Sequence, residues 1–431
     1  MRMIRTHAAA VAFAATAALT LSACSSADGG TSAGDGTVSG DITLLSPIFE
    51  GSEGQRLLED ELLPQFYAKY PDVKVTVDYT TYNQLNEKLT TAVASGLVPD
   101  VMMMGVGWVE SFADRGVLAN LSETGLTQEK LEESYTKEIV EAGMWEDSVY
   151  ALPIMLDTRF GVARMDLLRE AGYDAPPKTW DELTEMSKAL TVRSEDGTLQ
   201  RTGFDVQSMD PRQMFMTMLF SAGGDLFTED LTAPAFNSPA GVDALEFVSD
   251  LIHVDKVEDI GFSSASADPN PLVNGRAAMA IAHNNVWSQF EKAAPELLGE
   301  LQPFVIQGEA SGMFFGGTLA TVSAKSKHPE AAQALMEFLA SPGPALAANE
   351  QRGNVPALTE LLDSDYVQGN PLVQFAMENL DVARREGGPA QWLEIRGTFK
   401  PAIEAALLGQ QTPQEALDGL AKSAQTAIDR K

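Results

Sequence analysis

The chain has 431 residues and carries 30 lysines and arginines against 61 aspartates and glutamates, which gives a formal charge of −31 at pH 7. A surface this acidic repels nucleic acids and anionic lipids, so the composition excludes both as direct partners of the folded surface. Hydrophobic residues make up 44% of the chain, as in ordinary globular proteins. Residues 41–431 are more than one hydrophobic core normally organises, so we expect two lobes.

The first 23 residues predict a signal peptide. Their only lysines or arginines are Arg2 and Arg5, they contain no acidic residue, and residues 8–21 form a predominantly apolar run. A run of this length is too short to cross a bilayer and suits the core of a signal peptide. We therefore expect an exported protein from which this segment is removed.

Cys24 is the only cysteine in the chain, so it cannot form an internal disulfide. Residues 21–24, with the sequence LSAC, resemble a bacterial lipobox. The resemblance implies that Cys24 becomes the mature N-terminus and carries lipid, and the alternative is a plain signal peptide cut after Ala23. Residues 25–40 include five glycines and predict a flexible tether with a coil span of about 20–25 Å.

The body of the chain opens with alternating strand and helix patterns. Strands are predicted where apolar residues run or alternate with polar ones, and helices where apolar residues recur at helical spacing. The expected order is a strand at 41–46, a helix at 55–70, a strand at 73–79, a helix at 81–95 and a strand at 99–104. This order predicts a parallel sheet with helices on both faces.

Ligands of such sheets bind beyond the carboxyl ends of the strands, which here are residues 46–51 and 105–108. Glu50 lies at the first of these ends and Trp108 at the second. A tryptophan can stack on the apolar face of a sugar ring while its indole N–H donates a hydrogen bond. Glu50 and Trp108 are therefore candidate ligand-binding residues, with Trp108 as the aromatic platform.

Residues 150–183 predict a transition between two structural units. The apolar run at 149–155 gives way to the polar triplet Asp157-Thr158-Arg159, and a helix is expected at 164–171. A second helix follows the capping-box spacing of Thr179 and Glu182. We expect the chain to leave one unit with a carboxylate and a guanidinium exposed; the alternative is a loop with an ordinary surface ion pair.

The remaining patterns predict further helices and strands. Helices are expected at 213–222, 238–252, 330–339 and from Thr412 onward, and strands at 277–282 and 316–322. The chain breaks at Ser341-Pro342, because proline does not continue a helix. From 154 to about 274 the pattern is more helical than at the start of the body.

The motifs of common enzymes are missing from the sequence. There is no G-x-S-x-G, no H-E-x-x-H and no P-loop, and four histidines with one cysteine leave no Cys/His metal cluster. We therefore expect no catalysis, no cofactor and no metal. A glycosidase needs only two carboxylates, so a secreted carbohydrate-active hydrolase stays as an alternative.

Six segments of the sequence resemble, in order, the carbohydrate-binding, maltose-binding-protein-like family of extracellular solute-binding proteins of ABC importers. They are PDVMMMGVGWVESFADRGVLANL, YALPIMLDTRFGVARMDLLREAGYDAPPKTWDEL, FSAGGDLF, FNSPAGVDALEF, NGRAAMAIAHNNVW and FFGGTLATVSAKSKHPEAAQALMEFLASP. The similarity runs from about residue 40 almost to the C-terminus. No single segment is decisive, but their order is specific.

The resemblance implies an α/β, two-lobe periplasmic-binding-protein-like fold with discontinuous lobes. Lobe one would be residues 41–153 plus 276–340, and lobe two 154–275 plus 341–431, with a three-segment hinge near Pro153, Gly275 and Ser341. The protein would be a monomer, anchored by lipid to the outer face of the cytoplasmic membrane. It would bind a saccharide between the lobes and deliver it to permease subunits; the alternative ligand is a non-sugar small solute.

The resemblance also bears on individual residues. It implies that Asp157 and Arg159 contact the ligand, and that the pair Gly316-Gly317 lets the backbone approach it; an ordinary strand-entry turn is the alternative for the glycines. Gly105 stands where many relatives have an aspartate. The candidates that complete the ligand-binding set are Trp287, two positions from the usual ligand-side tryptophan, Arg352 at a turn expected on lobe two, and Trp392 as a lobe-two platform. Trp145 and Trp180 are interpreted as structural.

Overall fold

The computed structural model describes residues 38–264 and 269–430. The signal peptide, Cys24 and nearly all of the tether lie outside the described residues, so the expectations about them stay predictions. Within the described ranges, no helix combines the length and the apolar character needed to cross a membrane.

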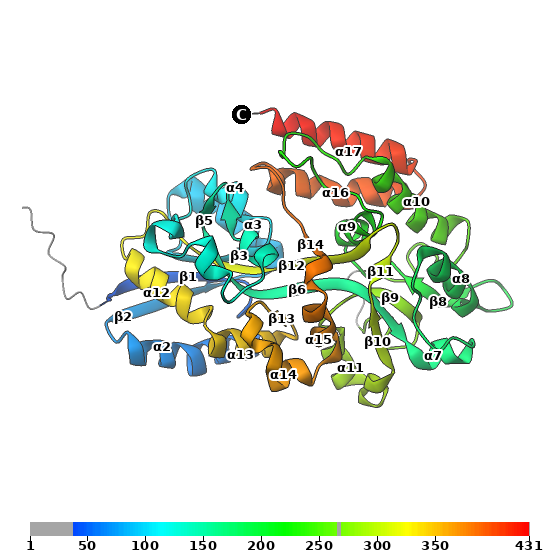
Figure 1. Cartoon of the computed structure of the whole chain (residues 1–431), viewed down its shortest axis with the longest axis horizontal. Helices are drawn as coiled ribbons and strands as arrows, with labels where there is room; N and C mark the ends of the chain where they lie inside the picture. Colours follow the sequence, from blue (N-terminus) through cyan, green and yellow to red (C-terminus); the bar gives the residue numbers. More distant parts are fainter. Residues whose placement is uncertain (1–37, 265–268, 431) are drawn as a thin grey trace, which may run out of the picture. The chain divides into compact units, whose positions relative to one another are not determined.

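A mixed sheet runs through the fold, with strands in the order β2-β1-β3-β12-β6-β9-β8-β7 (Figure 1). In addition, β10 and β13 pair with β6, and β11 and β14 pair with β12, while β4 and β5 form a separate hairpin. The strands are β1 (Gly40–Ser46), β2 (Val73–Tyr79), β3 (Val101–Gly105), β4 (Met144–Trp145), β5 (Ser148–Val149), β6 (Ala151–Arg164), β7 (Val192–Arg193), β8 (Leu199–Asp205), β9 (Ala277–His283), β10 (Leu301–Phe304), β11 (Ile306–Gln307), β12 (Ser311–Val322), β13 (Val355–Pro356) and β14 (Ala383–Arg385).

The predicted parallel start of the sheet is confirmed. β1 pairs in parallel with both β2 and β3. Helix α3 (Tyr82–Ser95) lies between β2 and β3 in the chain. It begins after Thr81, whose hydroxyl accepts a hydrogen bond from the backbone N–H of Gln84, and it ends at Gly96, which is in the left-handed conformation. These caps satisfy backbone groups that the helix ends leave free, which explains why the sequence located this helix correctly.

The polar triplet Asp157-Thr158-Arg159 does not break the chain as expected. It lies inside the 14-residue strand β6, which pairs with β12 on one side and with β9 on the other. Hydrogen bonds from two neighbouring strands hold this backbone extended despite its polar side chains. The helix expected next is α7, which begins at Met165.

Buried apolar side chains form two clusters, which we call the first core and the second core. Helices that bury residues in the first core are η1 (Leu57–Leu62), α2 (Leu63–Lys69), α3 (Tyr82–Ser95), α4 (Val109–Ala113), η2 (Leu121–Thr124), α5 (Gln128–Leu131), α6 (Lys137–Glu141), α11 (Val286–Ala293), α12 (Pro329–Leu339), α13 (Pro342–Arg352), η4 (Thr359–Asp363), α14 (Asp365–Gln368), α15 (Pro371–Glu378) and η5 (Leu380–Val382). α1 (Gly51–Arg56) directly precedes η1, and η3 (Pro295–Glu300) lies after α11. The second core is covered by α7 (Met165–Glu170), α8 (Trp180–Leu190), α9 (Pro211–Ser221), α10 (Pro239–His253), α16 (Trp392–Leu407) and α17 (Pro413–Ile428).

The change of lobe expected at Ser341 does not match the packing. Ala345 and Ala348 of α13 and Leu372 of α15 belong to the first core, and side chains join the second core again only from α16. Ser341-Pro342 starts a new helix on the same core, with the proline in its first turn. A proline shows where a helix begins, but not which core that helix covers.

Candidate functional site

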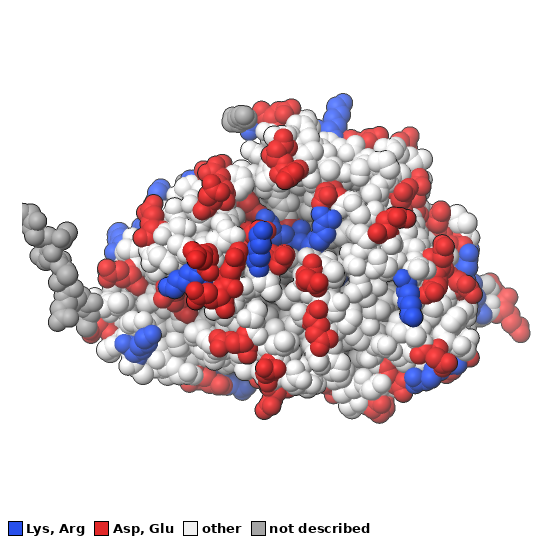
Figure 2. Space-filling model, in the orientation of Figure 1, with Lys and Arg blue, Asp and Glu red and all other residues white. Residues whose placement is uncertain are grey.

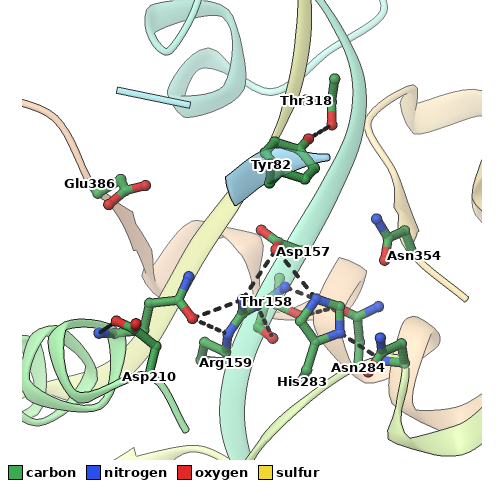
Figure 3. A network of polar contacts seen from close by, with 12 residues as sticks. Tyr82, Asp157, Thr158, Arg159, Asp210, His283, Asn284, Thr318, Asn354 and Glu386 are labelled. Atoms are coloured by element: carbon green, nitrogen blue, oxygen red, sulfur yellow. Dashed lines mark hydrogen bonds and ion pairs between the residues drawn. The ribbon is translucent and has the colours of Figure 1, made fainter. Parts of the chain in front are cut away.

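Asp157 and Arg159 of β6 meet His283 of β9 at the centre of a polar network (Figure 3). Residues two apart on a strand share a face, and Arg159 lies opposite His283 in the antiparallel register. Asp157 Oδ2 is 3.1 Å from Arg159 Nη2 and 3.3 Å from His283 Nε2. The pairing of β6 with β9 therefore brings together residues that are 126 positions apart.

Arg159 is held by the protein itself. Its Nε and Nη2 donate to Gln213 Oε1 at 3.1 and 3.0 Å, and its Nη1 donates to the carbonyl of Thr158. Its side chain is only 6% exposed. Most of its donors are thus engaged, so Arg159 positions the Asp157 carboxylate more than it offers bonds of its own.

The charges in this network settle the ionisation of Asp157. Burial disfavours its carboxylate, but the positive charge of Arg159 and the hydrogen bond from His283 outweigh burial and hold its pKa well below the usual range. Burial and the charge of Arg159 also lower the pKa of His283, although Asp157 opposes this. At neutral pH, Asp157 is therefore a carboxylate beside a neutral imidazole.

That imidazole has one consistent tautomer. Nε2 faces the Asp157 carboxylate, so it carries the proton, while Nδ1 accepts the backbone N–H of Asn285 at 3.0 Å. The neighbouring Asn284 accepts the backbone N–H of Thr158 through Oδ1 and donates to the carbonyl of Gly353 through Nδ2. These bonds tie β6, the end of β9 and the end of α13 together.

A cavity of about 220 Å³ adjoins Asp157. At its edge, the hydroxyls of Tyr82 and Thr318 are hydrogen-bonded to each other. Every lining residue except Gly317 carries a polar or charged side chain, so the cavity can exchange several directed hydrogen bonds with a polar solute. The lining residues are Tyr82, Asp157, His283, Asn285, Gly317, Thr318, Arg352 and Asn354.

Arg352 reaches this cavity from the first core, not from lobe two as expected. It ends α13, and its Nη1 donates to the carbonyl of Ile48 at 3.0 Å. Ile48 follows β1, so Arg352 meets the strand end that was predicted to face a ligand. Glu50 precedes α1 as its N-cap residue and does not line the cavity.

The Gly316-Gly317 pair is required first by the protein's own packing. A Cβ on Gly316 would lie 2.5 Å from Asp157 Oδ1, and a Cβ on Gly317 would lie 2.2 Å from the carbonyl oxygen of Met155. Gly317 also has a φ of +145°. The pair thus makes room for β6 and its carboxylate, and only Gly317 reaches the cavity.

None of the three expected tryptophan platforms presents an open face. Trp108 is 3% exposed, Trp287 is 9% exposed, and Trp392 is fully buried. The Trp287 indole donates to Glu291 on its own helix. Trp392 packs against Phe227 and other aromatic rings of the second core. Ligand contact by these three residues stays a prediction, because the spacing of the residues along the chain does not show what covers a ring.

Trp108 and Trp392 lie where the two cores meet. The guanidinium of Arg396, on α16, lies over the Trp108 ring at 5.8 Å, and Ser111 of α4 donates to the carbonyl of Ala390 at 2.7 Å. The indole nitrogen of Trp392 is buried and has no hydrogen-bond partner among the described residues. The two cores therefore cover both rings jointly.

Six residues of this network were not predicted from the sequence: Tyr82, Gln213, His283, Asn284, Thr318 and Asn354. Asn285 was the alternative to Trp287 as the ligand-facing residue, and it lines the cavity. His283 and the two asparagines stood next to Trp287 in a segment already singled out. Their pattern HNN, directly after an apolar strand, was the available signal. Trp180, interpreted as structural, does pack on the second core and donates to Ser221 at 2.8 Å.

Comparison with known proteins shows a match to a protein family and to individual relatives. A family model described as "Bacterial extracellular solute-binding protein" matches residues 51–345. The "Galactooligosaccharide-binding protein" of Bacillus subtilis is 23% identical over 392 residues, which cover 89% of each chain. An "Uncharacterized lipoprotein in oleD 5'region" of Streptomyces antibioticus is 28% identical over 295 residues, 65% of this chain and 63% of that one.

A solved structure shares the fold. The GacH receptor of Streptomyces glaucescens superposes with a TM-score of 0.76 at 23% identity, covering 91% of this chain and 99% of that one. That receptor was solved unliganded and in complex with acarbose and an acarbose homolog. The mixed α/β architecture is thus that of the two-lobe binding proteins, as the sequence implied.

Proposed function

This chain belongs to the bacterial extracellular solute-binding proteins, and on that premise we propose that it binds an extracellular saccharide and delivers it to the permease of an ABC importer. The observation that carries the proposal is the polar cavity beside Asp157. An ionised carboxylate accepts strong hydrogen bonds from sugar hydroxyls, and the side chains of Arg352, Asn285 and Asn354 can donate to them. The galactooligosaccharide-binding relative and the acarbose complexes of GacH support a saccharide as the ligand.

The site works by binding alone in this proposal. Arg159 and His283 keep Asp157 ionised and oriented, so it serves as a fixed acceptor and not as a proton donor. We assign Asp157, Arg352 and Gly317 to direct contact, Arg159 to positioning, and Glu50 to the rim. Trp108 and Trp392 would contact a ligand only if the two cores moved apart, and Trp287 only if its packing on the first core changed.

The protein would act as a monomer tethered to the outer face of the cytoplasmic membrane through lipid on Cys24. The motif LSAC and the lipoprotein relative support the anchor. The cores would close over the ligand about the shared strands β6, β9 and β12, whose buried side chains contribute to both cores. Closure of this kind gives a permease a bound form to recognise.

The test is a ligand screen followed by calorimetry. The protein is screened by thermal shift against mono- and oligosaccharides and against non-sugar solutes. Only a saccharide should raise the melting temperature of the protein. Asp157→Asn should then weaken binding of that saccharide about tenfold to a hundredfold, since a charge-assisted bond contributes about 1.5–3 kcal/mol.

Asp166→Asn is the matched control, because Asp166 pairs with Arg164 at 2.7 Å but lies away from the cavity. It should leave the affinity unchanged. If only a non-sugar solute raises the melting temperature, the proposed ligand is that solute and not a saccharide. Equal affinities of wild type and Asp157→Asn would remove the site assignment.

A further inference from the structure

A second pocket, of about 810 Å³, lies on the opposite face of β12 from Asp157. Phe315 lines this pocket, whereas the adjacent Gly316 faces the Asp157 carboxylate. Neighbouring residues of a strand point to opposite faces, so the two pockets are separated by β12 itself. We call this second pocket the acidic pocket, after the carboxylates that line it together with Trp145, Phe227, Arg384 and Arg385.

The acidic pocket has more negative charge than its own cations neutralise. Arg385 binds Glu110 at 2.7 Å, and Arg384 is paired with Asp225. Figure 2 shows basic side chains in a hollow flanked by acidic ones, where Figure 1 places β14. Four more lining carboxylates form no ion pair within residues 38–264 and 269–430: Glu138, Glu146, Asp147 and Glu229.

Glu110 adds an independent indication of a missing partner. The residue is 2% exposed, and its Oε1 binds Arg385. Its other oxygen, Oε2, is buried and has no hydrogen-bond partner in the described part of the chain. A buried carboxylate oxygen without a donor costs free energy, so a donor brought by a ligand would be stabilised here.

The walls also offer apolar surface. Trp145, in the β4–β5 hairpin, is only partly buried and lines the pocket, as does Phe227. Ammonium groups are attracted to the face of a tryptophan, most strongly where water is partly excluded. The pocket thus combines spaced carboxylates with an aromatic face, which suits a flexible cation with alkyl segments between its charges.

We propose that the acidic pocket is a second binding site, for an organic cation that carries several ammonium groups, of the polyamine type. One ammonium would pair with the carboxylate of Glu110, which lines the pocket, and the others would meet the unpaired carboxylates at the rim. The site is separated from the saccharide cavity by β12. An anion would be repelled by the same carboxylates, and a neutral solute would leave the four unpaired carboxylates without a cation.

The test is isothermal titration calorimetry, in which spermidine is titrated into the mature protein. The control ligand is 1,8-octanediol, which has the same chain length and no charge. We expect saturable one-to-one binding of spermidine that weakens as sodium chloride is raised, and no binding of the diol. Equal binding of the diol, or binding of spermidine without a defined stoichiometry, would overturn the proposal.

Two variants locate the site. Glu110→Gln, and the double variant Glu146→Gln/Asp147→Asn, should each weaken spermidine binding at least tenfold. The matched control is Glu132→Gln/Glu133→Gln. It also removes two negative charges from neighbouring residues, but these two residues are exposed and do not line the pocket. If both double variants weaken binding alike, the protein attracts spermidine only through its overall charge and the proposal fails. Should Glu110→Gln not fold, the two double variants still decide the question.

Discussion

Gly105 and Trp108 share one small space, since a Cβ on Gly105 would lie 2.9 Å from the indole nitrogen of Trp108. The sequence marked Gly105 as a departure from relatives that carry an aspartate there. The structure supplies a physical reason, because the indole fills the volume that a side chain at 105 would occupy. The glycine at 105 and the tryptophan at 108 therefore depend on each other for packing.

We predict that Gly105→Ala destabilises the protein by about 1–3 kcal/mol, the usual cost of overpacking a filled core. Urea unfolding measures the change. Gly397→Ala is the control, because a Cβ on this α16 glycine meets nothing within 4 Å. It should be neutral or stabilising, by up to about 1 kcal/mol, since alanine favours helices over glycine. Equal effects of the two substitutions would contradict the shared-space explanation.

Arg159→Gln should destabilise the protein more at pH 7 than at pH 3. The substitution leaves the Asp157 carboxylate buried without its cation, which costs about 3–5 kcal/mol for a fully buried pair and less here because Asp157 is 24% exposed.

The sign follows from the lowered pKa of Asp157. A carboxylate with a lowered folded-state pKa contributes stability above its unfolded pKa of about 3.9, and this is lost as pH falls through the folded value. The gap between wild type and variant should therefore narrow on acidification in urea unfolding. A gap that stays constant from pH 7 to pH 3 would show that Asp157 is not the partner that matters.

Glu258→Gln should remove a contribution to the free energy of unfolding that decreases as the pH rises. The contribution of Asp157 has the opposite pH dependence. Burial and the neighbouring Asp205 raise the pKa of Glu258 well above its usual value, and both residues are almost fully buried. A carboxyl group with a raised folded-state pKa stabilises the fold below its unfolded pKa of about 4.3, and this stability is lost as pH rises through the folded value.

Glutamine keeps the shape and a donor for Asp205 but cannot ionise. We therefore expect Glu258→Gln to match wild type near pH 4 and to be at least as stable at pH 8, as measured by urea unfolding. Glu404→Gln, on the surface of α16, is the control and should preserve the wild-type pH profile. A variant that is destabilised most at high pH would show that the glutamate is needed as an anion.

Thr412→Ala should cost more than Thr179→Ala, because only Thr412 has a complete capping box. Thr412 Oγ1 accepts the backbone N–H of Glu415, and the Glu415 carboxylate accepts the backbone N–H of Thr412. At Thr179 the returning carboxylate of Glu182 binds the backbone N–H of Lys178 instead. We expect about 1 kcal/mol or more for Thr412→Ala in urea unfolding, and a smaller loss for Thr179→Ala.

Features that depend on neighbours along the chain could be predicted from the sequence. The caps at Thr81 and Thr412, the left-handed stop at Gly96 and the alternation of β2 are local, because backbone groups at helix ends and the two faces of a strand are served by nearby residues. The order of family-like segments likewise predicted the α/β fold. Asp157 was singled out from its sequence alone.

The tertiary structure decided what lies against each of these elements. Only the pairing of β6 with β9 brings His283 to Asp157, and only packing against elements distant in the chain buries Trp108 and Trp392. A ring or a carboxylate looks the same in the sequence whether it faces solvent or another core. Burial, pKa and the availability of hydrogen-bonding groups depend on surfaces supplied by distant residues, so no local pattern could have fixed them.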